Sequence, residues 1–175
     1  NEAVRAIPLP DRKKEPEGMS PRERELLEDI AMNPLSVVTE RYKRLEWSAH
    51  TGEKTKRKLL EKGLIEKERI GVPHGSVTLL KFTDNGHNLL VSWGYKIKTL
   101  PKNASLEHEY YKEITARRYR EMGYEIRKEV KLARGRAVDL VATRGDERVA
   151  IEIETGKSDV EANVKKCRKA GFEHI

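Results

Sequence analysis

Apolar residues recur at helical spacing through the first half of the chain, and short alternating runs follow them. Ser20-Pro21-Arg22-Glu23 combines an N-cap serine, a proline at the first helical position and a glutamate at the third, which predicts the start of a helix. The same spacing predicts helices over 37–45 and 51–62. A first strand is predicted to begin at 64 and a second to run over 77–82, with a turn at 71–75 between them, and a helix or turn is predicted to open at 83. Three helices followed by a hairpin is the element order of a winged helix.

A second series of elements begins after residue 104. The pattern predicts a long helix over 105–122, strands over 125–132, 137–143 and 148–154, and a last helix over 158–170. Glycines at 123, 156 and 171 mark the ends of elements. The expected fold class is α+β, with a leader over 1–18, a winged helix over 19–92, a linker over 93–104, and an α/β domain with a central mixed sheet over 105–175.

The composition is strongly charged and basic. Charged and hydrophobic residues each make up 37% of the chain, the formal net charge is +7, and the pI is about 9.4. So low an apolar content favours two small cores over one large core. The positive charge favours a polyanionic partner, nucleic acid first and an anionic membrane second, and the alternative is a well-solvated surface. Glutamine is absent and Glu, Lys and Arg are abundant, as in proteins of hyperthermophiles.

Several classes of site are excluded by what the sequence lacks. A lone cysteine, Cys167, cannot form a disulfide within the chain or a cysteine-rich zinc site, and we expect it to be a small buried residue. No apolar run approaches the roughly 18 residues that a membrane span needs, and the start shows no signal-peptide pattern. Without a glycine-rich phosphate loop, ATP hydrolysis is not expected. We therefore expect a cytoplasmic protein without a membrane partner.

The two ends of the sequence suggest a piece of a longer polypeptide. The chain starts at Asn1 rather than at a methionine, and its last residues, 172–175, have the pattern of the first residues of a strand. We therefore expect the C-terminal domain to be truncated.

The predicted helix over 51–62 is the most basic in the chain. Lys and Arg around small polar residues suit a helix that approaches base edges while it holds phosphates. The side chains that we expect to face DNA from this helix are Thr51, Lys54, Arg57 and Lys58, and those that we expect to pack inward are Thr55, Leu59 and Leu60. The turn at 71–75 is the expected tip of the wing, where His74, and Lys81 on the following strand, are expected to contact the backbone.

Residues 18–90 resemble the winged helix-turn-helix superfamily. The run Lys-Leu-Leu-Glu-Lys-Gly-Leu-Ile at 58–65, followed by a hairpin, carries the resemblance. The resemblance implies a DNA partner. The alternative is a winged helix that serves protein contacts or acts as a spacer.

Three acids fall on one face of the predicted hairpin of the C-terminal domain. If Gly145-Asp146 is a two-residue turn, Asp139 lies directly opposite Glu152, and strand alternation places Glu154 on the same face. Grouped carboxylates are ligands that suit Mg²⁺ or Mn²⁺, which could polarise a phosphodiester and activate a water. The alternative is an acidic strand face turned to solvent.

This region resembles the PD-(D/E)XK nuclease superfamily, which includes restriction enzymes and archaeal Holliday-junction resolvases. The order helix, strand, hairpin with an Asp and then a Glu-x-Lys, and helix maps onto 105–170, with Glu154 at the usual lysine position. The resemblance implies Asp139 and Glu152 as metal ligands and a helical acid, Glu109 or Glu113, as a further catalytic residue. Asn163 lies where some members of the superfamily carry a Gln that supports the site. Lys157, three residues after Glu154, could swing back to serve the attacking water or the scissile phosphate, and we expect Glu154 to help Asp139 and Glu152 hold the metal-bound water.

Other residues have less specific interpretations. His108 could assist at the same site or be a surface histidine, and Trp47 and Trp93 are expected in a core or a domain interface.

These observations lead to one hypothesis and two alternatives. The leading hypothesis is a metal-dependent endodeoxyribonuclease that a winged helix directs to duplex or branched DNA, with a homodimer implied by the resemblance. One alternative is a DNA-binding transcription regulator whose nuclease fold is inactive and serves dimerisation. The other is an accessory module of a larger mobile-element or translocase protein.

Overall fold

The structure is a computed structural model that describes residues 18–97, 105–133, 136–156 and 159–175 of the chain. The leader at 1–17, most of the expected linker, and Lys157 lie outside the described residues. The chain divides into two compact units, residues 1–99 and 100–175, which we call the first and the second unit and describe separately. No helix in the described ranges has the length and apolar character needed to cross a bilayer.

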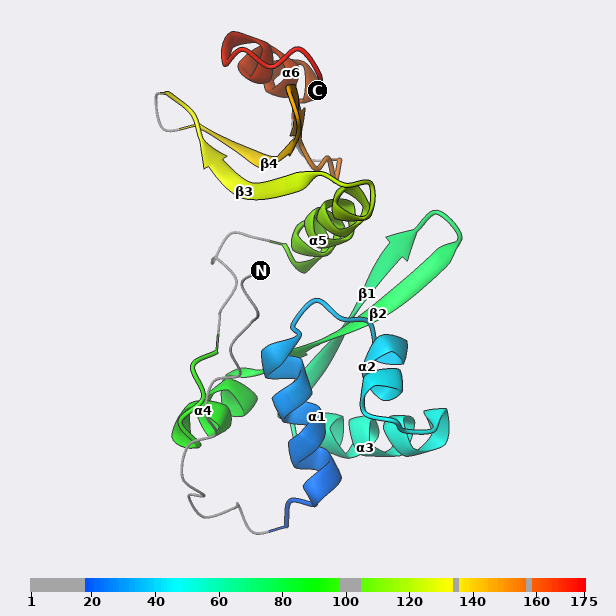
Figure 1. Cartoon of the computed structure of the whole chain (residues 1–175). Helices are drawn as coiled ribbons and strands as arrows, with labels where there is room; N and C mark the ends of the chain where they lie inside the picture. The colour runs from blue at the N-terminus through cyan, green and yellow to red at the C-terminus, as the bar shows by residue number, and fades with distance from the viewer. Residues whose placement is uncertain (1–17, 98–104, 134–135, 157–158) are drawn as a thin grey trace. The chain divides into compact units, whose positions relative to one another are not determined.

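The first unit is a winged helix in its order of elements (Figure 1). Its elements are α1 (Pro21–Met32), α2 (Val38–Arg44), α3 (Ala49–Glu61), β1 (Ile65–Val72), β2 (Gly75–Phe82) and α4 (Asp84–Ser92). The strands form an antiparallel hairpin in which Val72 pairs with Gly75, and an isolated antiparallel bridge joins Val37, between α1 and α2, to Leu79 of β2. The predicted order is confirmed, and the segment after Thr83 is a helix.

Side-chain caps explain where the helices begin. Ser20 and Glu23 form the predicted capping box, in which each side chain bonds the backbone N–H of the other residue. The Ser48 hydroxyl accepts a hydrogen bond from Thr51 N, so α3 begins at Ala49, two residues before the predicted start. Thr83 caps α4 in the same way.

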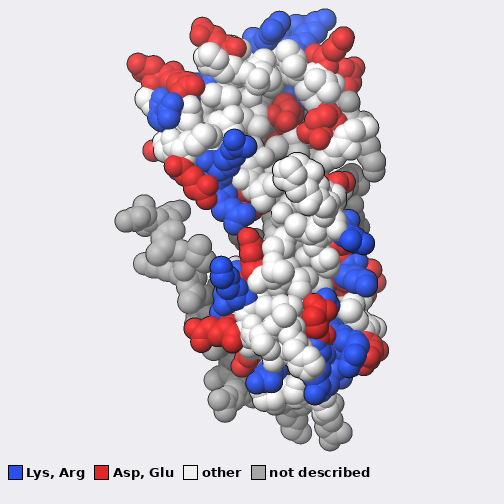
Figure 2. Space-filling model, turned by 90° about the vertical axis from the view of Figure 1, so that its right-hand side faces the viewer, with Lys and Arg blue, Asp and Glu red and all other residues white. Residues whose placement is uncertain are grey.

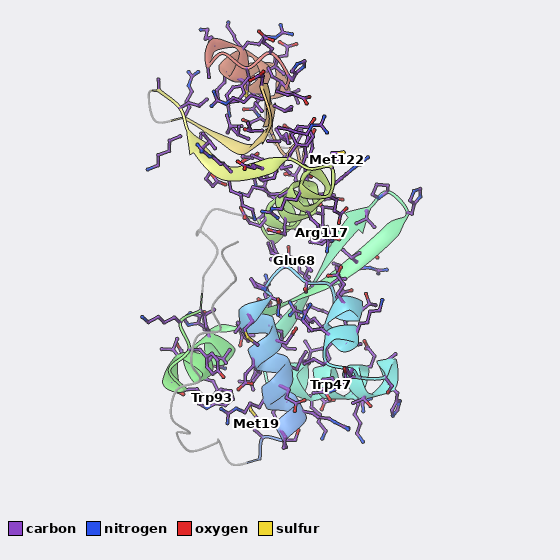
Figure 3. The ribbon with its side chains drawn as sticks, in the orientation of Figure 1. Met19, Trp47, Glu68, Trp93, Arg117 and Met122 are labelled. Atoms are coloured by element: carbon purple, nitrogen blue, oxygen red, sulfur yellow. The ribbon has the colours of Figure 1, made fainter. Side chains whose placement is uncertain are left out.

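The core of the first unit continues past residue 92, where the sequence suggested that the domain ends. Trp93 is buried, and Tyr95 and Ile97 pack against the same cluster. Figure 3 labels Trp93 together with Met19 and Trp47, which also contact this core. Residues 93–97 therefore belong to the first unit rather than to a linker. The buried residues of the cluster include Leu26, Leu27, Ile30, Val38, Tyr42, Leu59, Ile65, Leu80 and Leu90.

The turn between α2 and α3 depends on a close approach at Gly52. A Cβ atom on Gly52 would lie 2.5 Å from carbons of the Tyr42 ring, so the two helices pack this closely because the residue is glycine. Tyr42 also donates a hydrogen bond to Glu53 Oε1 at 3.0 Å. Glu46, in the turn, has a φ of 56°, the left-handed conformation that reverses the chain. Together these contacts fix α3 against α2.

The second unit packs helices against a three-stranded sheet. Its elements are α5 (Leu106–Glu121), β3 (Glu125–Lys131), β4 (Ala137–Arg144), β5 (Glu147–Ile151) and α6 (Val160–Lys169). The strand order is β3-β4-β5 with antiparallel pairing, and its core contains Val138, Val141, Ala150, Cys167 and Phe172. Among the described residues, the only parallel pairing of the expected mixed sheet is a bridge between Val149 and His174, where Ala150 N donates to His174 O at 2.9 Å.

A buried carboxylate in α1 should make the stability of the first unit depend on acid pH. Burial alone would raise the pKa of Glu23, which is 2% exposed, but the ion pair with Lys62 at 2.6 Å and hydrogen bonds from Ser20 outweigh it and lower the pKa to about 2. The stabilisation should therefore be complete above about pH 4.5 and be lost as the pH falls towards 2. Glu23→Gln should cost roughly 2 kcal/mol at pH 7.

The measurement is urea unfolding from pH 7 to pH 2, followed by tryptophan fluorescence, since both tryptophans lie in the first unit. The difference between the wild type and Glu23→Gln should shrink below pH 4.5, whereas the exposed control Glu25→Gln should follow the wild type. A difference that does not change with pH would contradict the assignment.

Candidate functional site

The outer face of α3 carries the basic residues that the sequence selected for DNA contact. Lys54, Arg57 and Lys58 are exposed and Thr51 is half-buried, whereas Thr55 and Leu59 turn into the core. Arg57 Nε lies 3.7 Å from Glu61 Oε1, in a pair that is itself exposed. The helix therefore presents a cationic face on the side opposite its buried stripe.

The hairpin of β1 and β2 offers a different set of cations from the one expected. His74 is exposed at the tip, but Lys81 Nζ lies 3.2 Å from Glu68 Oε2 and 3.4 Å from Glu66 Oε1. The hydrogen bond to Glu68 raises the pKa of Lys81, and the two glutamates neutralise its charge locally. Arg69, which the sequence analysis missed, is exposed near the tip and donates to Ser76 Oγ at 2.7 Å.

Basic and acidic side chains lie in scattered mixed groups around broad uncharged areas of the visible surface (Figure 2). In the lower part of that view, which shows the first unit, Lys and Arg side chains gather beside acidic ones rather than forming one uninterrupted patch. Ion pairs of the kind found along α3, such as Lys56 with Glu53 at 2.6 Å, account for this mixture. A face that binds a polyanion should therefore be recognised by cations that lack an acidic partner.

Asp139 on β4 is central to the second candidate site, and its surroundings differ from the predicted ones. The predicted turn at Gly145-Asp146 and its register are observed, with Arg144 opposite Glu147 and Leu140 opposite Ile151. The ladder ends there, three residues short of the predicted end of β5. Asp139 Oδ2 instead accepts a hydrogen bond from Ile153 N at 2.8 Å. Asp139 therefore bonds a backbone N–H, whereas the predicted register placed the Glu152 carboxylate opposite it.

The two helical acids that the sequence left open lie in different surroundings. His108 Nε2 is 3.3 Å from Asp139 Oδ2, and its Nδ1 is 3.8 Å from Glu109 Oε1. Glu113 instead pairs with Lys128 and with Arg120, at 3.4 Å in the second case, and neither pair involves His108 or Asp139. The structure therefore brings Glu109 towards Asp139 through His108 and leaves Glu113 outside the cluster.

A buried lysine that the sequence analysis missed lies beside Glu109. Lys112 is 3% exposed; its Nζ is 2.6 Å from Glu109 Oε1 and also pairs with Glu129. Burial alone would lower the pKa of Lys112, but the bonds to these two glutamates outweigh it and raise the pKa. Glu129 has a φ of 50° and is skipped in the pairing of β3 with β4, which turns it towards this lysine.

Glu152 is likewise paired with a lysine. Lys166 Nζ on α6 lies 2.8 Å from Glu152 Oε1 and donates to Ala137 O at 2.8 Å. Burial and the neighbouring Glu152 raise the pKa of the Cys167 thiol, which lies 3.6 Å from the same oxygen. Lys166 follows Asn163 by three residues and so shares a face of α6, which is a signal that the sequence contained.

Glu154 and Asn163 share one cavity with Glu152. This cavity has a volume of about 450 Å³, and its lining also includes Tyr119 and His174. Glu154 Oε1 accepts a hydrogen bond from Gly156 N at 2.9 Å, so this carboxylate bonds its own turn. The described lining of this cavity does not include Asp139, which instead contacts the backbone at Ile153, between Glu152 and Glu154.

The described residues do not fit a divalent metal as they are placed. Among them, no group of three or more His, Cys, Asp or Glu side chains is arranged to hold a metal ion. Glu152 is paired with Lys166, and Asp139 is bonded to Ile153 N and lies near His108. A Mg²⁺ or Mn²⁺ site built on Asp139 and Glu152 would require these partners to move.

Comparisons with known proteins leave the family open. No family model and no curated protein sequence matches the chain. Among solved structures, the PcaV transcriptional regulator from Streptomyces coelicolor, crystallised with its natural ligand, is similar at 23% identity and a TM-score of 0.40, over 45% of this chain and 55% of that protein. A proposed transcription factor from Pseudomonas aeruginosa is similar at 18% identity and a TM-score of 0.34, over 83% and 90%.

Both structural likenesses are weak. The match spans little more than half the length of PcaV, and both TM-scores lie below 0.5, so neither carries an argument about function. The assignment of the first unit as a winged helix therefore depends on its own topology, and neither comparison shows a nuclease.

The pair of Glu152 and Lys166 should make a measurable contribution to the stability of the second unit. Their side chains are 15% and 13% exposed, so each charge depends on the other for compensation. A double-mutant cycle with Glu152→Gln and Lys166→Met should give a coupling energy of about 1–2 kcal/mol. Far-UV circular dichroism during urea unfolding is the measurement, with the exposed Lys165→Met as the control. Additive effects would show that the pair does not stabilise the fold.

Proposed function

We propose that this protein binds duplex DNA through its first unit, with α3 as the recognition helix and the β1–β2 hairpin as the wing. The observation that carries this proposal is the exposed row of Lys54, Arg57 and Lys58 on a helix whose opposite face is buried. An α-helix fits the major groove of B-form DNA, where side chains near its start reach base edges. The contacts of Tyr42 and Gly52 hold α3 in position to present that face.

The charge of the whole chain supports the same partner. A formal charge of +7 attracts a polyanion at long range, and cations without acidic partners supply the local contacts. Arg69 and His74 on the hairpin can then contact the backbone beside the groove that α3 enters. Such contacts set affinity and orientation, whereas the few side chains at base edges set sequence preference.

The ion pairs of the second unit favour a regulatory or accessory role for this unit over a catalytic one. Its acids at Glu109, Glu129 and Glu152 each face a lysine, which stabilises them without a metal. This unit can therefore act as a scaffold or a dimerisation domain in a DNA-binding regulator or in a larger assembly.

The DNA proposal predicts a loss of affinity when the α3 face is neutralised. Lys54→Gln and Arg57→Gln should each weaken binding to a mixed-sequence duplex by about tenfold near 100 mM salt, because each removes a backbone or base contact. Fluorescence anisotropy with a labelled duplex is the measurement, and the exposed Lys43→Gln on α2 is the control for overall charge. Equal affinities for all four proteins would reject α3 as the binding face.

Metal-dependent cleavage of DNA is a second candidate. The observation that favours it is the order helix, three strands, helix and paired terminal segment, which carries Asp139 on the central strand and Glu152 directly after β5. The activity would use Mg²⁺ or Mn²⁺, held by Asp139 and Glu152 after these residues exchange their present partners. Among the two helical acids considered, Glu109 is linked to Asp139 through His108.

Cleavage assays on supercoiled, linear and branched DNA with Mg²⁺ or Mn²⁺ separate the two candidates. If the second candidate holds, Asp139→Ala should lower the cleavage rate at least about 100-fold, because the metal-bound nucleophile is lost. Glu113→Ala is the matched control, since Glu113 pairs with Lys128 outside the cluster. Cleavage that survives Asp139→Ala would rule out this site, and no cleavage of any substrate would leave binding as the function.

A further inference from the structure

A cavity of about 480 Å³ lies between the start of α1 and residues 50–58 of α3. Its lining includes Arg22 from α1 together with His50, Lys54 and Lys58 from α3, as well as the hydroxyls of Ser20 and Thr51. No acidic side chain of the described residues lines it. Three full positive charges thus surround one concave space that has hydroxyl groups at its edge.

These three cations differ from their neighbours because no described acidic residue pairs with them. Lys56 pairs with Glu53 and Lys62 with Glu23, both at 2.6 Å, and Arg57 pairs more loosely with Glu61 at 3.7 Å. Within the described part of the chain, no ion pair or hydrogen bond involves the side chain of Arg22, Lys54 or Lys58. The cations around this cavity therefore have fewer described acidic partners than the other cations of α3 and its C-terminal cap.

The arrangement is unfavourable without an anion. Lys54 and Lys58 are four residues apart on one helix face, a spacing at which like charges repel. Arg22 adds a third positive charge from the neighbouring helix. A bound anion would turn this repulsion into attraction, with Arg22 able to donate two parallel hydrogen bonds and the lysines acting as point charges.

The side chains, and not the end of α1, would hold this anion. The first turn of α1 is already capped, because Ser20 Oγ accepts from Glu23 N and the Glu23 carboxylate accepts from Ser20 N. That carboxylate points to Lys62 rather than into the cavity. The attraction for an anion therefore comes from Arg22, Lys54 and Lys58.

We infer that this cavity binds a phosphate group of the DNA backbone beside the groove that α3 enters. The inference rests on the proposed function and adds the place where one strand is anchored. Lys54 belongs both to the exposed face of α3 and to the cavity, so a groove contact and a phosphate contact are adjacent. A phosphate held there fixes the orientation of the recognition helix without reading sequence.

The test compares Arg22→Gln and Lys58→Gln with the wild type and with Lys43→Gln, all in the full chain. Affinity for a labelled mixed-sequence duplex is measured by anisotropy from 50 to 300 mM salt. Each cavity variant should bind about fivefold more weakly and lower the slope of log K against log salt concentration by about one, equally for unrelated sequences. Lys43→Gln should leave the slope unchanged. Far-UV circular dichroism checks that each variant is folded.

A titration with inorganic phosphate distinguishes this inference from the proposed function. Saturable amide shifts in NMR spectra at Arg22, Thr51 and Lys58, lost in Arg22→Gln, would support the phosphate site. If the wild type binds DNA but both cavity variants keep its slope, the inference is wrong and the recognition helix stands. If the wild type binds no duplex, the proposed function and the inference are both wrong for DNA. Localised amide shifts on phosphate addition would then identify a free phosphate compound as the ligand.

Discussion

The first unit depends on one buried ion pair, between Arg41 of α2 and Asp29 of α1. The Arg41 side chain is fully buried; its Nη1 donates to Asp29 Oδ2 at 2.7 Å and its Nη2 to Asn33 O at 2.7 Å. Arg44 Nε completes the cluster at 2.6 Å from Asp29 Oδ1. Burial lowers the pKa of Arg41 and the bond to Asp29 opposes that effect. Since an unpaired buried charge costs several kcal/mol, this pair holds the end of α1, the following turn and α2 in one arrangement.

The position of the DNA-contacting helix follows from that arrangement. With α2 fixed, Tyr42 presents its ring to Gly52, and no side chain larger than hydrogen fits between them. Glu46 adopts the left-handed conformation that the turn requires, and Ser48 then caps α3. The inner face of α3 therefore packs in the core, and the cations on its outer face point towards solvent. The surface that we propose for DNA is thus a consequence of packing on the other side of the same helix.

The sequence predicted those parts of the molecule that local chemistry determines. Caps such as Ser20, turns such as Gly145-Asp146 and the periodicity of apolar residues are encoded within a few residues, and these elements are observed. The early end of β5, which gives Asp139 a backbone donor, was not encoded locally. The pairings of Lys112 with Glu129 and of Lys166 with Glu152 were also missed, because each joins residues from different elements. Spacing along α5 could not separate Glu109 from Glu113, whereas the packing of α5 on the sheet does.

The two units differ in whether their charged side chains have partners, and this difference favours DNA binding over DNA cleavage. In the second unit, Lys166 pairs with Glu152, one of the two carboxylates proposed to hold a metal, and Lys112 pairs with the helical acid Glu109. A divalent ion on Glu152 would have to displace Lys166, which also donates to Ala137 O, and leave this lysine without a counter-ion. Among the described residues of the first unit, Lys54 and Lys58 are exposed and have no acidic partner, so a polyanion can bind to them without breaking a described pair. The DNA contacts that we propose for the first unit therefore break no described ion pair, whereas a metal on Glu152 would break its pair with Lys166.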